Sequence, residues 1–497
     1  MKNHSAVILL LSKSLELEGQ KPLYRQICDV LREAILSRRL RAGTNLPSTR
    51  SLARELSVSR NTVMSAFDQL IAEGYLKGAQ GNGTFVADEL PDEILRFRFK
   101  KVLDNRQAHA KAKLSKRGSE ITQIPFRVER DSDNTRAFSI GFADITEFPL
   151  EVWKRLLARN IRNMSRSMLG YDGVLGYPPL RAAIAAYLKT SKGIECETSQ
   201  IIIISGSQQG LDLAARILLE EGDEVVIEDP NLTGKHGGAF ATKTKISPIP
   251  IDENGLNVSE ISRLATNPRA ALITPASQFP TGITMSLSRR FELLEWAEAN
   301  NAWIIEDDYS SEFHYGSRPI SPVQAMDLGG RVIYIGTFSK TMFPALRLGY
   351  LVVPPNFVDA FRRAIAFTSR QPSFLEQITL SDFISEGFFG RHIRKIRAIY
   401  SERRSCLIEL IERNLVDFVE IKKSEAGMHL VGELRNELCG RKLVESAAQK
   451  GLFLSAISEY CINAKIPDAL LFGFTSIIKN EMAPGVAALR EILECSN

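Results

Sequence analysis

The chain has 497 residues, of which 44% are hydrophobic and 24% are charged. Because these fractions are close to the averages for globular proteins, the composition excludes collagen, a long coiled coil and a chain that is disordered throughout. The formal net charge of +5 is too small to indicate nucleic-acid binding by itself. The longest early apolar run, residues 6–11, is far shorter than the roughly 18 residues of a membrane span, and the cysteines and histidines show no metal-type clustering, so we expect a cytoplasmic protein without a membrane anchor or a metal site.

Three helices are expected near the start of the chain. Apolar residues recur every four positions between 22 and 37, which predicts an amphipathic helix. A second helix is expected to begin at Pro47 and to stop at the polar residues 57–59. Ser59 is a favourable N-cap for a third helix, which would end at Gly74. The side chains that the third helix is expected to turn inward are Val63, Phe67, Leu70 and Ile71.

Two short strands are expected next, at 75–77 and 84–86, and the glycine-rich residues 78–83 would join them in a tight hairpin. Three helices and such a hairpin are typical of a winged helix-turn-helix, whose third helix enters the major groove of DNA. Arginine and asparagine there can recognise base edges, whereas an arginine on the preceding helix is better placed for phosphate. The candidate DNA-binding residues are Arg50, Arg60, Asn61, Thr62, Gly81 and Gly83.

Residues 20–88 resemble the GntR family of bacterial regulators. The resemblance is carried by residues 22–27, 46–53, 58–63 and 73–86, and it implies operator DNA as the partner and the six candidates above as contacts. Met64 stands where family members often have another arginine, so one contact would be missing. Two alternatives stay open, namely a helical module that binds no DNA and an Arg50 that pairs with acidic neighbours.

A basic segment at residues 89–135 is expected to link the first domain, residues 1–88, to a second one at 136–497. Between 94 and 117 it has nine lysines and arginines, opposed only by Asp104. The segment either adds a sequence-independent contact with DNA phosphates or is a solvated tether, and the second interpretation is favoured.

After residue 136 short strands alternate with longer helices, which indicates an α/β domain with a mainly parallel sheet. Residues beyond about 360 are expected to form a smaller C-terminal lobe. Open α/β sheets bind ligands beyond the carboxyl ends of their strands, and the predicted strands end in small or polar residues. The predicted strands are 201–204, 224–228, 270–274, 303–306 and 332–335.

Four pieces at these strand ends favour one phosphate-bearing cofactor. Residues 205–209 form a turn before an apolar helix, and a helix N-terminus binds phosphate well. An aspartate in 306–309 could pair with a protonated pyridine nitrogen. Lys340 could form a Schiff base with an aldehyde, and the guanidinium of Arg347 suits a phosphate. Taken alone, each piece also fits solvated acids after a strand or a surface lysine.

Together with residues 170–181, 274–282, 306–313 and 336–350, these pieces resemble the MocR subfamily of GntR regulators, which joins a winged helix to a fold type I, aspartate-aminotransferase-like domain. The resemblance implies pyridoxal 5′-phosphate bound through Lys340, Asp307 at the pyridine nitrogen, Tyr309 at the ring oxygen, and a homodimer. The residues that it implies for the phosphate are Gly206, Ser207, Gln208, Thr337 and Arg347.

Three positions depart from the subfamily. Leu232 replaces a tyrosine that would stack on the ring, and Ser277 replaces a histidine. Glu459 aligns with an arginine that grips a ligand carboxylate in amino-acid-sensing members. A glutamate would repel a carboxylate, so the effector is expected to be a small amine or pyridoxal phosphate itself. The competing interpretation is that the alignment slips in this weakly patterned lobe.

Two functions fit these observations. The favoured one is a transcriptional regulator whose aminotransferase-like domain senses an effector. The alternative is an active aminotransferase with a DNA-binding appendage, because the lysine, aspartate and phosphate-binding residues for that chemistry are present. A domain that binds no cofactor and serves only for dimerisation is disfavoured, since the polar set is complete.

Overall fold

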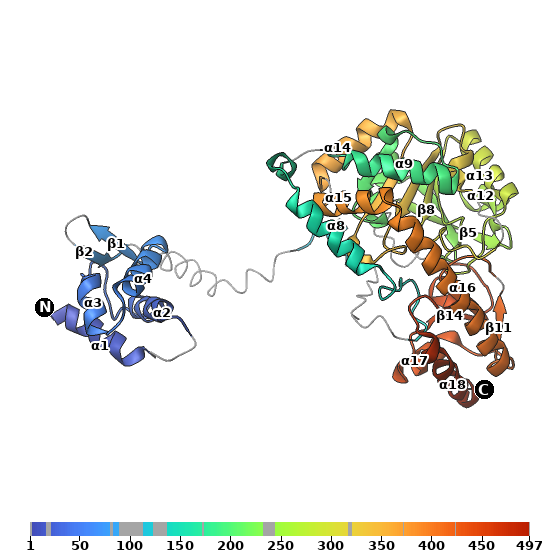
Figure 1. Cartoon of the computed structure of the whole chain (residues 1–497). Helices are drawn as coiled ribbons and strands as arrows, with labels where there is room; N and C mark the ends of the chain where they lie inside the picture. The colour runs from blue at the N-terminus through green and yellow to red at the C-terminus, as the bar shows by residue number, and fades with distance from the viewer. Residues whose placement is uncertain are drawn as a thin grey trace. The chain divides into compact units, whose positions relative to one another are not determined.

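A computed structural model describes residues 2–15, 21–79, 83–88, 113–122, 137–170, 173–231, 244–316, 321–370, 372–422 and 424–496. The chain falls into two compact units, residues 1–114 and 115–497 (Figure 1). The basic segment expected as a linker lies mostly outside the described residues, and its described part includes the short helix α7 (Lys116–Ile121). None of the described helices is long and apolar enough to cross a membrane.

The first unit is the predicted winged helix-turn-helix, and it has one additional helix. Its elements are α1 (Lys2–Ser14), α2 (Leu23–Leu36), α3 (Thr49–Glu55), α4 (Arg60–Ala72), β1 (Leu76–Ala79) and β2 (Gly83–Val86). The sequence had shown α1 only as an apolar run, and Val7 and Leu11 of this helix are fully buried in the core of the unit. The strands β1 and β2 pair antiparallel as expected.

Two details of this unit differ from the prediction. Helix α3 begins after Ser48 and not at Pro47, because the Ser48 hydroxyl accepts a hydrogen bond from the Ser51 amide over 3.1 Å and so caps the helix. Ile71 was predicted to face inward, but it is 40% exposed. The buried stripe of α4 consists of Val63, Ala66, Phe67 and Leu70, and Ile71 lies one position beyond it.

The second unit contains an eight-stranded sheet in the order β3-β10-β9-β8-β7-β4-β5-β6. The strands are β3 (Ile201–Ile204), β4 (Glu224–Asp229), β5 (Lys245–Asp252), β6 (Gly255–Leu256), β7 (Pro268–Ile273), β8 (Trp303–Asp308), β9 (Val332–Thr337) and β10 (Gly349–Val352). Strands β5, β4, β7, β8 and β9 are parallel, whereas β10 runs antiparallel to both β9 and β3. The predicted α/β class and mainly parallel sheet are confirmed.

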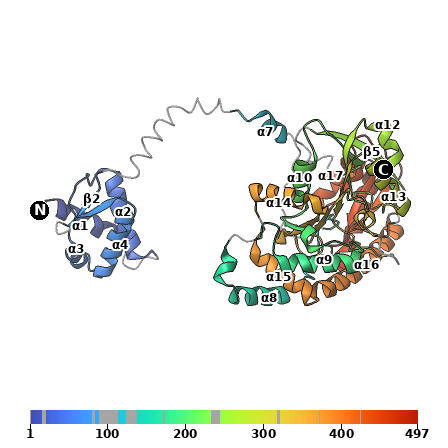
Figure 2. The same cartoon turned by 90° about the horizontal axis from the view of Figure 1, so that it is seen from above.

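Helices cover both faces of this sheet. On one face, α10 (Ser207–Leu218) and α14 (Val358–Thr368) bury their apolar side chains against alternate strand residues such as Ile333 and Ile335. On the other face lie α9 (Pro178–Lys192), α12 (Ile261–Leu264) and α13 (Leu287–Ala299). Two further helices lie on this side: α15 (Phe374–Ser385) packs against α9, and α8 (Leu150–Arg162) packs against α15 (Figure 2). The sheet is therefore buried on both faces, as its continuous apolar strands require.

The C-terminal lobe is built on a four-stranded antiparallel sheet in the order β11-β12-β14-β13. Its elements are α16 (Phe388–Asn414), β11 (Val419–Lys422), β12 (His429–Leu434), α17 (Gly440–Gln449), β13 (Ser455–Ala456), β14 (Ala469–Gly473) and α18 (Lys479–Ser496). The lobe also includes a segment from far earlier in the chain, because Phe138 is buried in its core and pairs with Gly473. A lobe made only from residues after 360 was therefore an incomplete prediction.

Candidate functional site

The N-terminus of α4 presents the candidate base-reading residues. The Ser59 hydroxyl accepts a hydrogen bond from the Thr62 amide over 3.1 Å, so the helix begins at Arg60. Arg60 and Asn61 are exposed in the first turn, whereas Thr62 is half-buried and its hydroxyl lies 2.9 Å from that of Ser59. Arg60 and Asn61 thus suit contacts with base edges better than Thr62 does.

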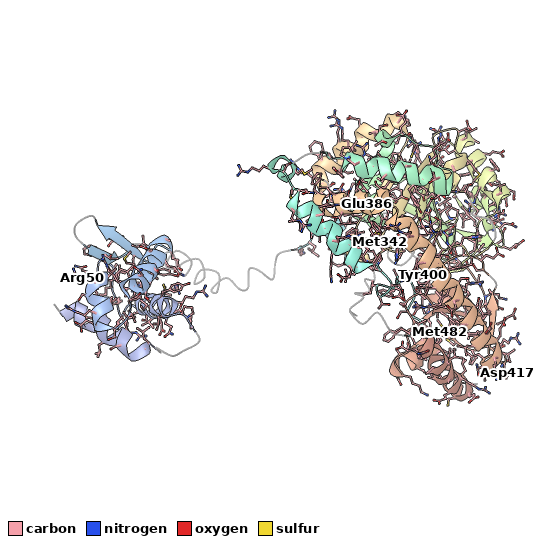
Figure 3. All side chains as sticks on the ribbon, in the orientation of Figure 1. Arg50, Met342, Glu386, Tyr400, Asp417 and Met482 are labelled. Carbon is pink, nitrogen blue, oxygen red and sulfur yellow. The ribbon has the colours of Figure 1, made fainter. Side chains whose placement is uncertain are left out.

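The other DNA-binding candidates lie on α3 and in the wing. Arg50 is exposed on α3 (Figure 3), and it forms no ion pair within the described chain, so the alternative of an acidic partner finds no support there. Gly83 begins β2 with φ +100°, a backbone conformation that favours glycine. Gly81 lies outside the described residues.

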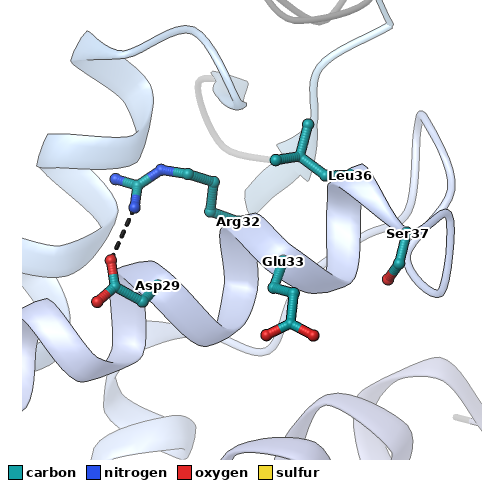
Figure 4. A pocket seen from close by; sticks show the side chains of 5 residues that line it. All are labelled: Asp29, Arg32, Glu33, Leu36 and Ser37. Atoms are coloured by element: carbon teal, nitrogen blue, oxygen red, sulfur yellow. Dashed lines mark hydrogen bonds and ion pairs between the residues drawn. The ribbon is translucent and has the colours of Figure 1, made fainter.

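An ion network holds α4 against α2. Arg32 donates to Glu73 at the end of α4 over 2.6 Å and to Asp29 on its own helix over 2.8 Å. The hydrogen bond from Arg32 lowers the pKa of the Glu73 carboxyl. Asp29 and Arg32, together with Glu33, Leu36 and Ser37, line a shallow pocket on α2 (Figure 4). Because Arg32 is already paired with Glu73 and Asp29, we assign these residues the structural role of positioning α4 against α2.

The cofactor candidates of the second unit meet at the carboxyl edge of the large sheet. Lys340 follows β9 and is half-buried, and its Nζ donates a hydrogen bond to the carbonyl oxygen of Gly141 over 2.6 Å. Asp307 lies near the end of the neighbouring strand β8, where the charge of Lys340 acts on its carboxylate. The structure therefore brings the predicted Schiff-base lysine and the predicted pyridine partner together.

Asp307 has a buried oxygen to which none of the described residues hydrogen-bonds. The residue is only partly buried as a whole, but its Oδ1 is inaccessible to solvent and accepts no hydrogen bond from any described residue. Burial, followed by the negative charge of Asp308, raises the pKa of Asp307 to about 7, against the opposing effect of Lys340. A cationic N–H donor would both satisfy this oxygen and favour its ionised form.

Tyr309 is oriented by the loop that follows β7. Its hydroxyl donates to the carbonyl oxygen of Ser277 over 2.8 Å, and burial raises its pKa above the ordinary value. The Ser277 hydroxyl is itself buried, and no described residue hydrogen-bonds to it. Tyr309 thus stays a neutral hydroxyl beside Asp307, whose charge also acts on it.

The phosphate candidates surround the N-terminus of α10. Gly206 precedes this helix with φ +86°, and a Cβ there would lie 3.7 Å from the guanidinium carbon of Arg347. Arg347 is exposed and donates to the carbonyl oxygen of Ser205 over 3.1 Å. Its φ of +51° is unusual for a residue with a side chain. An arginine fork that faces the amides of a helix N-terminus is a suitable cradle for a phosphate.

The remaining phosphate candidates differ in exposure. Thr337 is buried at the end of β9, and its hydroxyl accepts from the Ser339 amide over 3.2 Å. Ser207 is half-buried and Gln208 is exposed in the first turn of α10. The geometry thus favours the α10 N-terminus and Arg347 as phosphate-binding groups over the side chain of Gln208.

Sequence reasoning missed two contributors to this site. Gln209 accepts a hydrogen bond from the Ser205 amide over 2.5 Å and so fixes the turn before α10. The carbonyl of Gly141 holds the Lys340 amine. A glutamine in the first turn of the helix could have been recognised as a partner for the turn, but a backbone carbonyl from a distant segment leaves no signal in the sequence.

Of the three positions at which the sequence differs from the MocR subfamily, two lie among the described residues. The backbone carbonyl of Ser277 accepts the hydrogen bond of the Tyr309 hydroxyl. Glu459 ends the short helix η7 (Ile457–Glu459), and the next residue, Tyr460, contacts the ring of Phe279 at 5.0 Å between centroids. The segment that carries Glu459 therefore lies against the loop that carries Ser277. Leu232 lies outside the described residues.

Comparison with known proteins agrees with both units. Residues 139–467 match the model of the aminotransferase class I and II family, and residues 23–86 match that of the bacterial regulatory proteins of the gntR family. The chain is 38% identical over 477 residues to the "Probable rhizopine catabolism regulatory protein MocR" of Rhizobium meliloti, which covers 96% of this chain and 94% of that relative. The chain belongs to the MocR-type regulators.

Two other proteins extend this relationship. The MocR-type chain is 27% identical to the HTH-type pyridoxine biosynthesis transcriptional regulator PdxR of Corynebacterium glutamicum, over 91% of each chain. Its large unit is similar to the kynurenine aminotransferase of Pyrococcus horikoshii, with a TM-score of 0.67, 26% identity, and coverage of 81% of this chain and 98% of that one. The large unit therefore has the fold type I aminotransferase architecture.

Proposed function

We propose that this MocR-type regulator binds pyridoxal 5′-phosphate at Lys340 and changes its affinity for operator DNA when a small amine, or pyridoxal 5′-phosphate itself, occupies the site. The observation that carries the proposal is the buried Oδ1 of Asp307, which lies beside Lys340 and to which the described part of the chain supplies no donor. A pyridinium N–H is such a donor. The similar kynurenine aminotransferase was solved with PMP.

Each residue of the site would bind a different part of the cofactor. Lys340 offers the amine for an aldehyde, Asp307 accepts from the ring nitrogen, and the Tyr309 hydroxyl donates to the ring oxygen in exchange for its hydrogen bond to the Ser277 carbonyl. Arg347 and the N-terminus of α10 take the phosphate. When bound, the cofactor supplies an electrophilic carbon and an electron-withdrawing ring, which together can react reversibly with a primary amine.

We propose an amine-type effector because of the residues on the ligand side. Glu459 lies on a segment that packs against the loop of Ser277, and a glutamate there disfavours a carboxylate ligand. Names of relatives refer to rhizopine catabolism and to pyridoxine biosynthesis. Isothermal titration with simple amino acids and with polyamines tests this part of the proposal. Tight binding of an amino acid that is lost in Arg441→Ala would contradict it, since Arg441 donates to the Ser458 carbonyl beside Glu459.

The DNA-binding role implies a partner arrangement. We propose a homodimer, acting in the cytoplasm where its operator lies, whose two winged helices bind half-sites about one helical turn, ~34 Å, or a multiple of it apart. The effector can change operator affinity only if it binds the two conformations of the dimer differently.

Two measurements test the central proposal. The purified protein is expected to show a visible absorption band with pyridoxal phosphate that disappears on borohydride reduction and is absent in Lys340→Ala. The matched control is Lys395→Ala, which removes an exposed lysine that is paired with Glu147. A gel shift with DNA from upstream of the gene, with and without pyridoxal phosphate, tests the regulatory part. A band that survives in Lys340→Ala, or a gel shift indifferent to the cofactor, would contradict the proposal.

The second candidate function is an active aminotransferase with a DNA-binding appendage. The observation that favours it is the retention of Lys340, Asp307 and Tyr309 in one site. Amino-group transfer from amino acids to an oxo acid, measured on the same protein that shifts DNA, separates the two functions. Sustained turnover together with no cofactor effect on DNA binding would favour the enzyme.

A further inference from the structure

A buried group of charged residues lies directly behind the candidate cofactor site, and no role has yet been assigned to it. Lys192, the last residue of α9, is 2.7 Å from a carboxylate oxygen of Asp308 on β8 and 2.8 Å from one of Glu312. The three side chains are 6%, 2% and 8% exposed. We call Lys192, Asp308 and Glu312 the Lys192 cluster.

Hydroxyl groups from several elements complete the Lys192 cluster. Tyr334 on β9 donates to Asp308 over 2.5 Å, and Ser311 donates to the same oxygen over 2.6 Å. Tyr187 on α9 donates to Glu312 over 2.8 Å. Each carboxylate thus has a cation and a neutral donor, which is the condition under which charges are tolerated in a protein interior.

The Lys192 cluster and the cofactor site share the end of one strand. Successive side chains of a strand point to opposite faces, and here Asp307 and Tyr309 lie at the cofactor site while Asp308, between them, enters the Lys192 cluster. A movement of Asp308 would therefore displace both cofactor-facing neighbours.

The Lys192 cluster has one cation and two carboxylates, so it presents a net negative charge behind Asp307. Burial is the largest influence on the pKa of Asp308 and raises it, but the charge and hydrogen bond of Lys192, together with the hydrogen bonds from Ser311 and Tyr334, outweigh burial and lower this pKa. Burial lowers the pKa of Lys192, but the charges of Asp308 and then Glu312 together outweigh burial and raise this pKa.

Other titratable groups also face the Lys192 cluster. They include Tyr334 and Tyr350, and the charges of Glu306 and Arg290 also act on Asp308. On the cofactor side, Asp307 faces Lys340 and Tyr309.

We propose that the Lys192 cluster positions the end of β8 and keeps a negative charge behind Asp307, so that the proton shared between Asp307 and a ring nitrogen bound there is retained to higher pH. This inference rests on the proposed function, in which pyridoxal phosphate binds at Lys340. Lys192, Asp308 and Glu312 are positioning residues, because they act on the cofactor through Asp307 without touching it. A protonated ring is the form that withdraws electrons from the amine-reactive carbon.

Ring-¹⁵N-labelled pyridoxal phosphate gives a direct test, since the chemical shift of the ring nitrogen reports its protonation. In the full-length protein, Asp308→Asn removes the nearest negative charge, so we expect the pH at which the ring loses its proton to fall by about one unit. Lys192→Met leaves two buried carboxylates without a cation, so both should take up a proton and the ring should respond similarly. Glu312→Gln removes a charge farther along the cluster and should give a smaller shift.

Two variants serve as controls. Lys192→Arg keeps the cation and should retain the wild-type ring titration. Glu224→Gln changes a buried carboxylate at the opposite end of the sheet, which accepts from the amides of Thr266 and Asn267, and it should leave the ring titration unchanged. Thermal unfolding of every variant is measured alongside, and if Lys192→Met does not fold, Asp308→Asn and Glu312→Gln decide.

The outcomes separate this inference from the proposed function. A wild-type protein that takes up no labelled cofactor overturns the proposed function. A wild-type protein with a protonated ring, and an Asp308→Asn variant with the same ring titration, overturns only the role of the Lys192 cluster. A shift of equal size in Glu224→Gln would also overturn it, because the effect would then be a general loss of packing.

Discussion

The amine of Lys340 lies 2.6 Å from the carbonyl oxygen of Gly141, although 199 residues separate them in the chain. The segment around Gly141 is attached to the C-terminal lobe on both sides. Before it, the Gly473 amide donates to the Phe138 carbonyl over 2.9 Å. After it, Asp144 forms a buried ion pair with Arg403 at 2.7 Å. The position of Lys340, the candidate cofactor lysine, therefore depends on contacts made by the lobe.

Gly473→Ala tests this dependence. A Cβ at Gly473 would lie 1.8 Å from the carbonyl oxygen of Ser139, so the segment must move away from β14. We expect a loss of about 1–3 kcal/mol in the free energy of unfolding, as for other overpacked sites, and a weaker visible band with pyridoxal phosphate. Gly390→Ala in α16 is the control, because the nearest atom would be 3.7 Å away. Equal stability and equal bands in the two variants would show that the contact is not needed.

The buried carboxyl of Glu228 should make stability depend on pH. Burial raises its pKa from 4.5 to about 7, although Thr274 donates to it. The folded state then binds more protons than the unfolded state between these values, so the free energy of unfolding falls as the pH rises. Glu228→Gln should remove roughly 3 kcal/mol of this dependence. Urea unfolding at about pH 4.5 and about pH 7 measures it, and curves that keep the wild-type dependence would contradict the assignment.

Arg347→Lys should weaken phosphate binding specifically. The guanidinium fork can bind a phosphate through two hydrogen bonds, which a lysine cannot reproduce. We expect the affinity for pyridoxal 5′-phosphate to fall about tenfold and the affinity for pyridoxal to stay the same. Arg362→Lys is the matched control, because Arg362 pairs with Asp359 on α14. Fluorescence titration with both compounds measures the change, and an equal loss for pyridoxal would point to a disturbed site and not to a lost phosphate contact.

Substitutions in the winged helix-turn-helix should distinguish residues that contact bases from residues that contact phosphates. Arg60→Ala and Asn61→Ala are each expected to cost about 1–3 kcal/mol of operator binding and to relax the preference for particular bases. Arg50→Ala should weaken binding to all DNA sequences. It should also reduce the slope of log affinity against log salt concentration by about one, because one counterion fewer is released from the DNA. Arg39→Ala is the control, because Arg39 pairs with Glu33 on α2. Fluorescence anisotropy at several salt concentrations measures these effects, and a loss of base preference in Arg50→Ala would reverse the assignment.

The sequence predicted the parallel strands because each is a short apolar run that ends in polar residues. It therefore also predicted Asp307, Thr337 and Lys340 at one edge, since parallel strands end together. The sequence did not predict β5, β6 or β10. Strand β5 has prolines at 248 and 250, which argue against a strand in sequence-based reasoning although they are tolerated here.

Contacts between distant segments could not be predicted. The ion pair between Lys192 and Asp308 joins the end of a helix to the end of a strand 116 residues later, and neither residue type indicates burial by itself. The same holds for the Gly141 carbonyl. Ile71 was misplaced because the small Ala66 occupies the inner stripe of α4.

The reversed direction of β10 brings Arg347 and Lys340 to the same edge of the sheet. Lys340 follows the end of β9, and Arg347 precedes the start of β10, which pairs antiparallel with β9 from Gly349 opposite Thr337. One connection between neighbouring strands thus carries both the Lys340 amine and the candidate phosphate-binding guanidinium of Arg347. Only Leu348 separates Arg347 from the start of β10, so the register of β10 against β9 fixes how far Arg347 lies from the α10 terminus, and a slip of that register would move the guanidinium while the connection before it stayed the same.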